Sequence, residues 1–142
     1  MFRVFPLMLI PVALYNLIVL FGNVIANNDM FHLLTKSFTV DMVSGEWAVS
    51  FSDVVLLLAI LMLFIEVIKS SGTSRREMIN NALSILVFVV ALIEFIMLKG
   101  FATSAFFFIT VLCLFDSIAG PTVTAVAAKR DIGLGSNIID AG

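Results

Sequence analysis

Four acidic residues stand inside long apolar stretches, where a charged side chain is costly in a membrane and is therefore a candidate for function. They are Asp53, Glu66, Glu94 and Asp116. At a rise of about 1.5 Å per residue, Asp53 and Glu94 fall within about 6 Å of one end of the helices predicted below. That position favours helix capping or contact with the membrane surface.

Glu66 and Asp116 lie deeper, each fifteen residues from the corresponding end of its predicted helix, or about 22 Å by the same rise. If the two carboxyl groups face each other, one should hold a proton, because like charges repel strongly in a low dielectric. Such a pair could relay protons. The alternative, which we favour, is that Glu66 pairs with Lys69 one turn later and Asp116 bonds Ser84, Ser117 or a backbone amide.

Other chemistry finds little support in the residue pattern. His32 is the only histidine and has no potential metal ligands beside it. Gly133–Gly135 lacks the third glycine of a dinucleotide loop, and no motif accompanies the serines. We therefore expect no enzyme activity, no metal and no cofactor; for Phe106–Phe108 lipid contact is expected, with a pigment or quinone as the alternative. The single cysteine, Cys113, allows no intrachain disulfide.

The composition indicates a membrane protein. Of 142 residues, 61% are hydrophobic and 13% are charged, and the mean hydropathy is +1.16. Four stretches approach the roughly 20 apolar residues that a membrane helix needs, namely residues 4–26, 51–68, 79–98 and 101–127. Their runs lack the alternation of barrel strands, so we predict an all-α membrane domain of four transmembrane helices. A net charge of −2 gives no reason to expect a nucleic-acid partner.

The cationic residues predict which side of the membrane each end occupies. Six lie on one side: Arg3, Lys69, Arg75, Arg76, Lys129 and Arg130. Two lie on the other: Lys36 and Lys99. Since cytoplasmic loops carry the excess of Lys and Arg, both termini are predicted in the cytoplasm.

The first apolar stretch is predicted to be a membrane helix rather than a cleaved signal peptide, because it is full length. Pro6 and Pro11 should leave its start kinked or frayed. Asn16 and Asn23, seven residues apart, are expected to hydrogen-bond to other helices. Beyond this stretch, Met30 to Lys36 could form a short helical turn on the outer interface.

Residues 37–51 alternate apolar and polar side chains, which predicts a β-hairpin in the outer segment 27–50. With a turn at Ser44-Gly45, the predicted pairs are Met42 with Trp47, Val40 with Val49, and Phe38 with Phe51. All six side chains then share one face. An isolated hairpin is marginal in water, so this face should rest on the protein's own helices and lipid headgroups, or dock a partner.

Three further features concern the helix ends. Ser52 and Asp53 are expected to cap the second long helix. Gly120-Pro121 should bend or break the last helix, and Gly120, Thr124 and Ala128 form a small-residue ridge that another helix could approach. The tail, residues 129–142, is polar and has no sequence feature that predicts order.

Three segments resemble a group of small uncharacterised bacterial inner-membrane proteins with four helices. They are SGEWAVSFSDVVLLLAILMLFIEVIKSS, NNALSILVFVVALIEF, and TSAFFFITVLCLFDSIAGPTV followed by AAKRDIG. The resemblance covers residues 43–133 and implies the bacterial cytoplasmic membrane. It brings no activity and no site residues.

The sequence thus predicts an accessory or scaffolding subunit of a larger inner-membrane complex. Docking would use the hairpin face, the small-residue ridge and the cytoplasmic tail. The alternative is a proton-coupled channel or transporter component, possible as a homo-oligomer, that uses Glu66 and Asp116.

Overall fold

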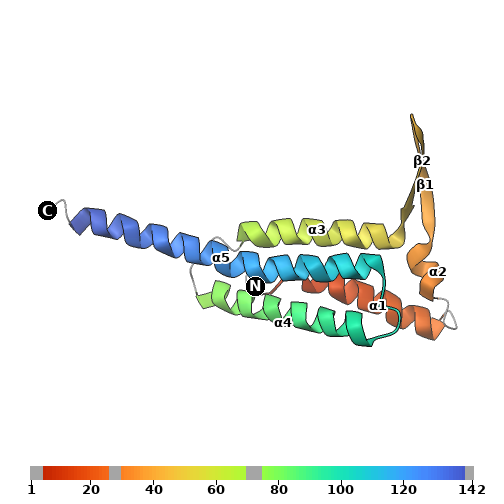
Figure 1. The fold of residues 1–142 in the computed structure, drawn as a ribbon, viewed down its shortest axis with the longest axis horizontal. Coiled ribbons are helices and arrows are strands. Elements are labelled where there is room, and N and C mark those ends of the chain that lie inside the picture. Colours follow the sequence, from red (N-terminus) through yellow and green to blue (C-terminus); the bar gives the residue numbers. More distant parts are fainter. Residues whose placement is uncertain (1–4, 26–29, 70–74, 140–142) are drawn as a thin grey trace.

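The computed structural model describes residues 5–25, 30–69 and 75–139, with side chains described for 5–22, 33–69, 75–123, 125, 126 and 129. The elements in chain order are α1 (Leu9–Ile25), α2 (Met30–Thr35), β1 (Ser37–Met42), β2 (Gly45–Ser50), α3 (Phe51–Lys69), α4 (Arg75–Met97) and α5 (Ser104–Ile139). Figure 1 shows α1, α3, α4 and α5 running alongside one another, with the β1–β2 hairpin at one end and crosswise to the helices. We call this the hairpin end of the bundle and the opposite end the tail end.

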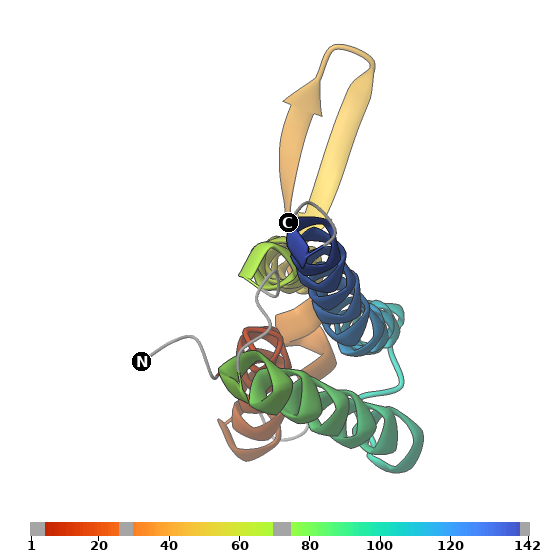
Figure 2. The same cartoon turned by 90° about the vertical axis from the view of Figure 1, so that its left-hand side faces the viewer.

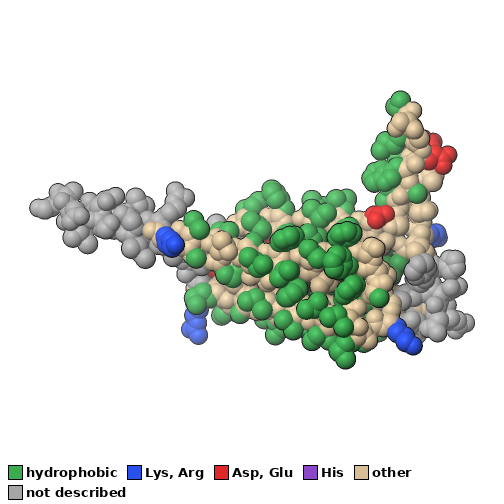
Figure 3. All heavy atoms as spheres, in the orientation of Figure 1, with side chains coloured by type: hydrophobic (Ala, Val, Ile, Leu, Met, Phe, Trp, Pro, Cys, Tyr) green, Lys and Arg blue, Asp and Glu red, His purple; other side chains and the backbone are tan. Residues whose placement is uncertain are grey.

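Three helical segments are long and apolar enough to cross a membrane: Phe51–Lys69, Arg75–Met97 and Ser104–Val123. The apolar part of α1, Leu9–Gly22, is shorter, so a fourth crossing remains a prediction. Hydrophobic side chains cover the visible flank of the helices (Figure 3), as expected for a surface that meets lipid. The chain therefore has the form of a multi-pass membrane protein.

The first long helix begins later than the sequence suggested. Turn-type backbone bonds from Leu9 N to Pro6 O (3.1 Å) and from Ile10 N to Leu7 O (3.0 Å) precede α1. Proline is tolerated at such positions because its missing N–H would be unpaired in the first turn in any case. A different helix, α4, begins at Arg75, which is earlier than its predicted start at residue 79.

The last helix corrects two predictions. It continues through Pro121 to Ile139, so Gly120-Pro121 does not break it and most of the tail is helical. Near the proline, Thr122 donates to Ile118 O at 2.7 Å and Ser117 to Leu114 O at 2.7 Å. Pro121 cannot donate to the carbonyl of Ser117 four residues earlier, and Thr122 supplies a side-chain bond in the same turn. Once the packed part of α5 has formed, its extension needs no new helix nucleus, and each added residue gains one backbone hydrogen bond.

The core lies between the four long helices. Its buried members are Val12, Tyr15 and Val19 of α1, Val55 and Ala59 of α3, Val87 and Ala91 of α4, and Phe106, Ile109 and Cys113 of α5. At the hairpin end, the Tyr15 hydroxyl and the Thr103 hydroxyl are 2.6 Å apart, and the Tyr15 ring packs against Phe101 and Phe106. This hydrogen bond joins α1 to the start of α5, and it spares the buried Tyr15 hydroxyl the cost of having no partner.

The hairpin forms where it was predicted, but its register differs by two residues. The observed pairs are Met42 with Gly45, Val40 with Trp47, and Phe38 with Val49. The turn is Val43-Ser44, and Gly45 follows it with a φ of +152°, a conformation that favours glycine. A shift of two residues leaves every side chain on its original face. The apolar face therefore survives, except that Phe51 belongs to α3.

The hairpin joins α3 without a loop. Phe51 N donates to Lys36 O at 3.1 Å across the base of the hairpin. Ser50 and Asp53 form a reciprocal cap, with Ser50 N to Asp53 Oδ2 at 2.9 Å and Asp53 N to Ser50 Oγ at 3.2 Å. This is a capping box with Ser50 at the N-cap and an acidic residue at N3. The predicted cap at Ser52 was thus two residues late.

The observed register gives a crosslinking prediction. In a Cys113→Ala background, Val40→Cys with Trp47→Cys should form a disulfide on mild oxidation, because directly opposite Cβ atoms lie about 5 Å apart. The matched pair Val40→Cys with Val49→Cys is diagonal, at about 7 Å, and should stay reduced. Gel mobility before and after reduction measures both. Preferential crosslinking of the second pair would contradict this register.

Candidate functional site: an apolar arm and a buried polar cluster

The hairpin, residues 37–50, forms an arm that leaves most of its apolar face uncovered. Phe38, Val40, Met42 and Trp47 are 56%, 38%, 52% and 55% exposed, whereas Val49 at the base is buried. The opposite face carries Thr39, Asp41, Glu46 and Ala48, since these residues pair with each other in the same register. The arm is therefore an amphipathic ribbon attached at its base.

The apolar face of the arm looks along the bundle toward the helices. Figure 3 shows hydrophobic side chains on that side of the arm and acidic side chains on the far side. The helix that continues from the arm, α3, exposes a row of large hydrophobic side chains at helical spacing: Val54, Leu57, Leu61, Phe64 and Ile68. Figures 1 and 2 both show the arm rising from the end of α3. The arm and α3 together form a surface with two apolar walls, which we call the apolar corner.

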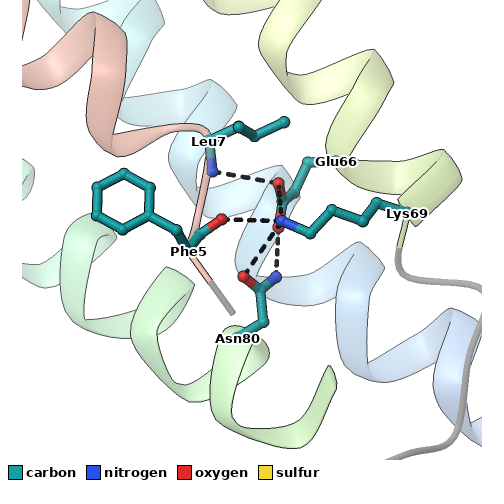
Figure 4. Close-up of polar contacts among 5 residues, drawn as sticks. All are labelled: Phe5, Leu7, Glu66, Lys69 and Asn80. Atoms are coloured by element: carbon teal, nitrogen blue, oxygen red, sulfur yellow. Dashed lines mark hydrogen bonds and ion pairs between the residues drawn. The ribbon is translucent and has the colours of Figure 1, made fainter. Parts of the chain in front are cut away.

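A polar cluster is buried near the tail end, around the Glu66 carboxylate. Lys69 Nζ lies 3.2 and 3.1 Å from its two oxygens, and Leu7 N donates to Oε2 at 3.1 Å. Asn80 Nδ2 also donates to Oε1, while Lys69 donates to Phe5 O at 2.8 Å. Figure 4 shows the five residues converging from the segment before α1, from α3 and from α4. The buried charge is paired and fully bonded, which is what makes it tolerable in an apolar bundle.

The structural alternative predicted for Glu66 is confirmed, since it forms an ion pair with Lys69 at 3.1 Å. Asp116 of α5 is buried and its side chain hydrogen-bonds Ser84 of α4, close enough to Glu66 and Lys69 for electrostatic interaction. Its Oδ2 atom has no hydrogen-bond partner within the described part of the chain. The two acids are neighbours, but each bonds its own partners.

The two acids nearer the hairpin end have structural roles; Asp53 is a cap as expected, whereas Glu94 bonds another helix rather than capping one or meeting the membrane surface. Asp53 caps α3 through Ser50. Glu94 of α4 accepts a bond of 2.9 Å from Asn16 Nδ2 of α1, which also fulfils the prediction that Asn16 bonds another helix. The side chains of Asn23 and His32 lie outside the described residues.

Gly120 of α5 lies close to Asn81 of α4. A Cβ atom built on Gly120 would lie 2.5 Å from Asn81 Oδ1, so a larger residue would force the Asn81 side chain or a helix to shift. The close approach expected of the small-residue ridge is thus made by α4 of the same chain. The side chains of Thr124 and Ala128, the other two members of the ridge, lie outside the described residues.

The residues that the structure describes contain no group of three His, Cys, Asp or Glu able to hold a metal ion. Cys113 is a buried free thiol in the core. Sequence reasoning missed Asn80, because an asparagine near a helix start carries no signal that its amide will reach a carboxylate on another helix. Sequence reasoning also placed Val49 on the uncovered face of the hairpin, because alternation does not show that the base of the hairpin is buried.

No known protein family, curated protein or solved structure matches this chain. The function must therefore be inferred from the arm, the apolar corner and the buried cluster.

The polar cluster predicts a nonadditive pair of substitutions. Lys69→Met should lower the free energy of unfolding by about 3 kcal/mol, because it leaves the fully buried Glu66 carboxylate without its cation. Adding Glu66→Gln should recover part of that loss, since a neutral amide needs no counterion. Unfolding of the detergent-solubilised protein by denaturant measures both. Losses that simply add would show that the pair is not coupled.

The contact between α4 and α5 predicts a second coupling. Gly120→Ala should destabilise the protein by about 2 kcal/mol, because the methyl group forces Asn81 or a helix to move. Asn81→Ala in the same chain should reduce that cost by at least about 0.5 kcal/mol, as contacting residues couple. Melting temperatures of the two single variants and the double variant test this. An unchanged cost in the double variant would place the conflict elsewhere.

Proposed function

We propose that the protein is a non-catalytic accessory or scaffolding subunit of a larger complex in a bacterial cytoplasmic membrane. The observation that carries this proposal is the apolar corner. Four large side chains of the arm are exposed and face the same region as the exposed flank of α3. An uncovered apolar surface of this shape suits a second protein that is itself embedded in the membrane.

The dimensions of the corner support a transmembrane partner. Each strand has six residues, so the arm reaches about 20 Å at about 3.3 Å per residue. Packed helices lie about 8–10 Å apart. Two partner helices that follow one another outward from α3, along the length of the arm, would therefore have their ends covered by the arm. Phe38 and Trp47 would contact those ends, and Leu57 and Leu61 would contact their flanks.

A two-stranded ribbon has a second reason to need a partner. Its two outer edges present unpaired N–H and C=O groups, and a lone hairpin is only marginally stable. A partner that covers the apolar face stabilises the ribbon, and a partner strand could also pair with an edge. The acidic side chains Asp41 and Glu46 stay on the far face, where water can reach them.

The proposed placement has four membrane crossings, with both termini in the cytoplasm and the arm outside. The excess of Lys and Arg at the tail end supports it. With α1 as the fourth crossing, its bond from Asn16 to Glu94 lies within the bundle. The arm would then lie along the outer surface, with its apolar face toward the membrane interior and its acids toward water.

A second candidate function is proton coupling, favoured by one observation. Asp116 Oδ2 is buried and has no hydrogen-bond partner in the described parts of the chain. Binding a proton at this oxygen would therefore break no hydrogen bond to a described residue. Glu66 suits the role less well, because a lysine, an asparagine and a backbone amide already satisfy it. We rank this function second for that reason.

The scaffold proposal is tested by affinity purification in a mild detergent at native abundance. The wild-type chain should recover a larger membrane assembly in fixed ratio. Phe38→Ser with Trp47→Ser should lose it, because both substitutions remove apolar contact area from the corner. Ala48→Ser on the opposite face is the matched control and should retain the assembly.

Two outcomes would count against the scaffold. One is equal recovery of the assembly by the double serine variant and the control, which would mean that lipid covers the corner. The other is recovery only as a homo-oligomer that conducts protons in liposomes, with the flux lost in Glu66→Gln and Asp116→Asn. The second outcome would favour the transporter.

A further inference from the structure

A continuous apolar groove runs along α1, on a flank separate from the apolar corner. Two hollows of about 430 Å³ and 360 Å³ share Leu14 and Leu17 as lining residues. The first continues toward the hairpin end past Phe21, and the second toward the tail end past Leu9. Figures 1 and 2 place α1 on the side of the bundle away from the arm.

One cation stands at the hairpin end of this groove. Lys36 lines the first hollow, and every other lining side chain of the two hollows is hydrophobic. Its backbone is held by the bond from Phe51 N to Lys36 O at 3.1 Å, so its position relative to the groove is fixed. No ion pair joins its ammonium group to another residue that the structure describes. Among the described residues, no acid competes for this charge with an anion from outside the chain.

The length of the groove fits one leaflet of a bilayer. From Leu9 to Phe21, twelve residues at about 1.5 Å per residue give about 18 Å. One leaflet is half of a hydrocarbon core about 30 Å thick, or about 15 Å. A chain that enters beside Lys36 would thus be covered along its whole length.

We propose that this groove binds a phospholipid with a net anionic headgroup. One acyl chain lies along α1 against Leu14 and Leu17, and the phosphate pairs with Lys36. A lipid fits better than a protein segment for two reasons. The described lining offers no polar group that could satisfy an extended peptide backbone, and its one described cation sits where the headgroup of a lipid in that leaflet must lie. The site needs the membrane but does not depend on the scaffold function.

The headgroup half of the site is tested by native mass spectrometry. The full chain is reconstituted in nanodiscs of phosphatidylcholine with a small share of phosphatidylglycerol, then released and weighed with its retained lipid. Wild-type protein should keep phosphatidylglycerol in preference to phosphatidylcholine. Lys36→Gln should lower that retention about fivefold, since one lysine near the surface contributes a modest attraction to anionic lipid. Lys99→Gln removes an exposed lysine that does not line the groove and should behave as wild type.

The acyl-chain half needs a separate variant. Leu17→Trp fills the groove where the two hollows join and should abolish retention. Ile93→Trp adds the same side chain at an exposed position of α4 and should not. Circular dichroism shows whether each variant keeps its helix content.

The outcomes separate the two halves of the site. Equal retention by Lys36→Gln and Lys99→Gln would overturn the role of the cation. Loss with Lys36→Gln but full retention with Leu17→Trp would mean a headgroup contact without a bound chain, and would overturn the groove. A wild-type protein that keeps no phosphatidylglycerol would overturn the site as a whole.

Discussion

The direct passage of β2 into α3 is the constraint on which the rest of the molecule depends. Ser50 ends the strand and Phe51 begins the helix, so no loop can relax the direction of the arm. The reciprocal bonds between Ser50 and Asp53 satisfy N–H groups that a helix start would otherwise leave unpaired. The bond from Phe51 N to Lys36 O closes the other strand onto the same point. Because of this junction the apolar face is held crosswise to the helices and faces the flank of α3.

The opposite end of the bundle is fixed by polar bonds of another kind. In an apolar environment an unpaired carboxylate would be severely unfavourable, and Glu66 gathers partners from three segments to avoid that state. In doing so it ties the residues before α1 to α3 and α4. Between the two ends the helices approach through small or slim side chains such as Ala59, Ala91 and Gly120. Close packing between polar anchors is how membrane helices associate without a hydrophobic driving force.

The sequence predicted elements better than it predicted their contacts. Apolar length identified the long helices, and alternation identified the hairpin and its apolar face, because both patterns follow directly from geometry. The register was wrong by two residues because turns at Ser44-Gly45 and at Val43-Ser44 put the same side chains on the same face. Pro121 misled in the other direction, since the helix continues through it although its ring removes one backbone donor. The Glu66–Lys69 pair was visible from spacing within one helix, whereas Asn80 reaches Glu66 only through the packing of two helices.

In the proposed placement, Lys36 would connect the arm to the membrane. It directly precedes β1, and a lysine beside anionic headgroups sets the depth of whatever is attached to it. If Lys36 lies at headgroup level, as proposed, the arm would lie at the same level, with its acids in water and its apolar face at the edge of the hydrocarbon. A partner helix that ends just below the surface would then find Trp47 and Phe38 above it and α3 beside it. The closed cluster around Glu66 offers no comparable opening, because a new ligand there would first have to displace Lys69 or Asn80. The uncovered surface at the hairpin end is therefore the more informative guide to what this protein does.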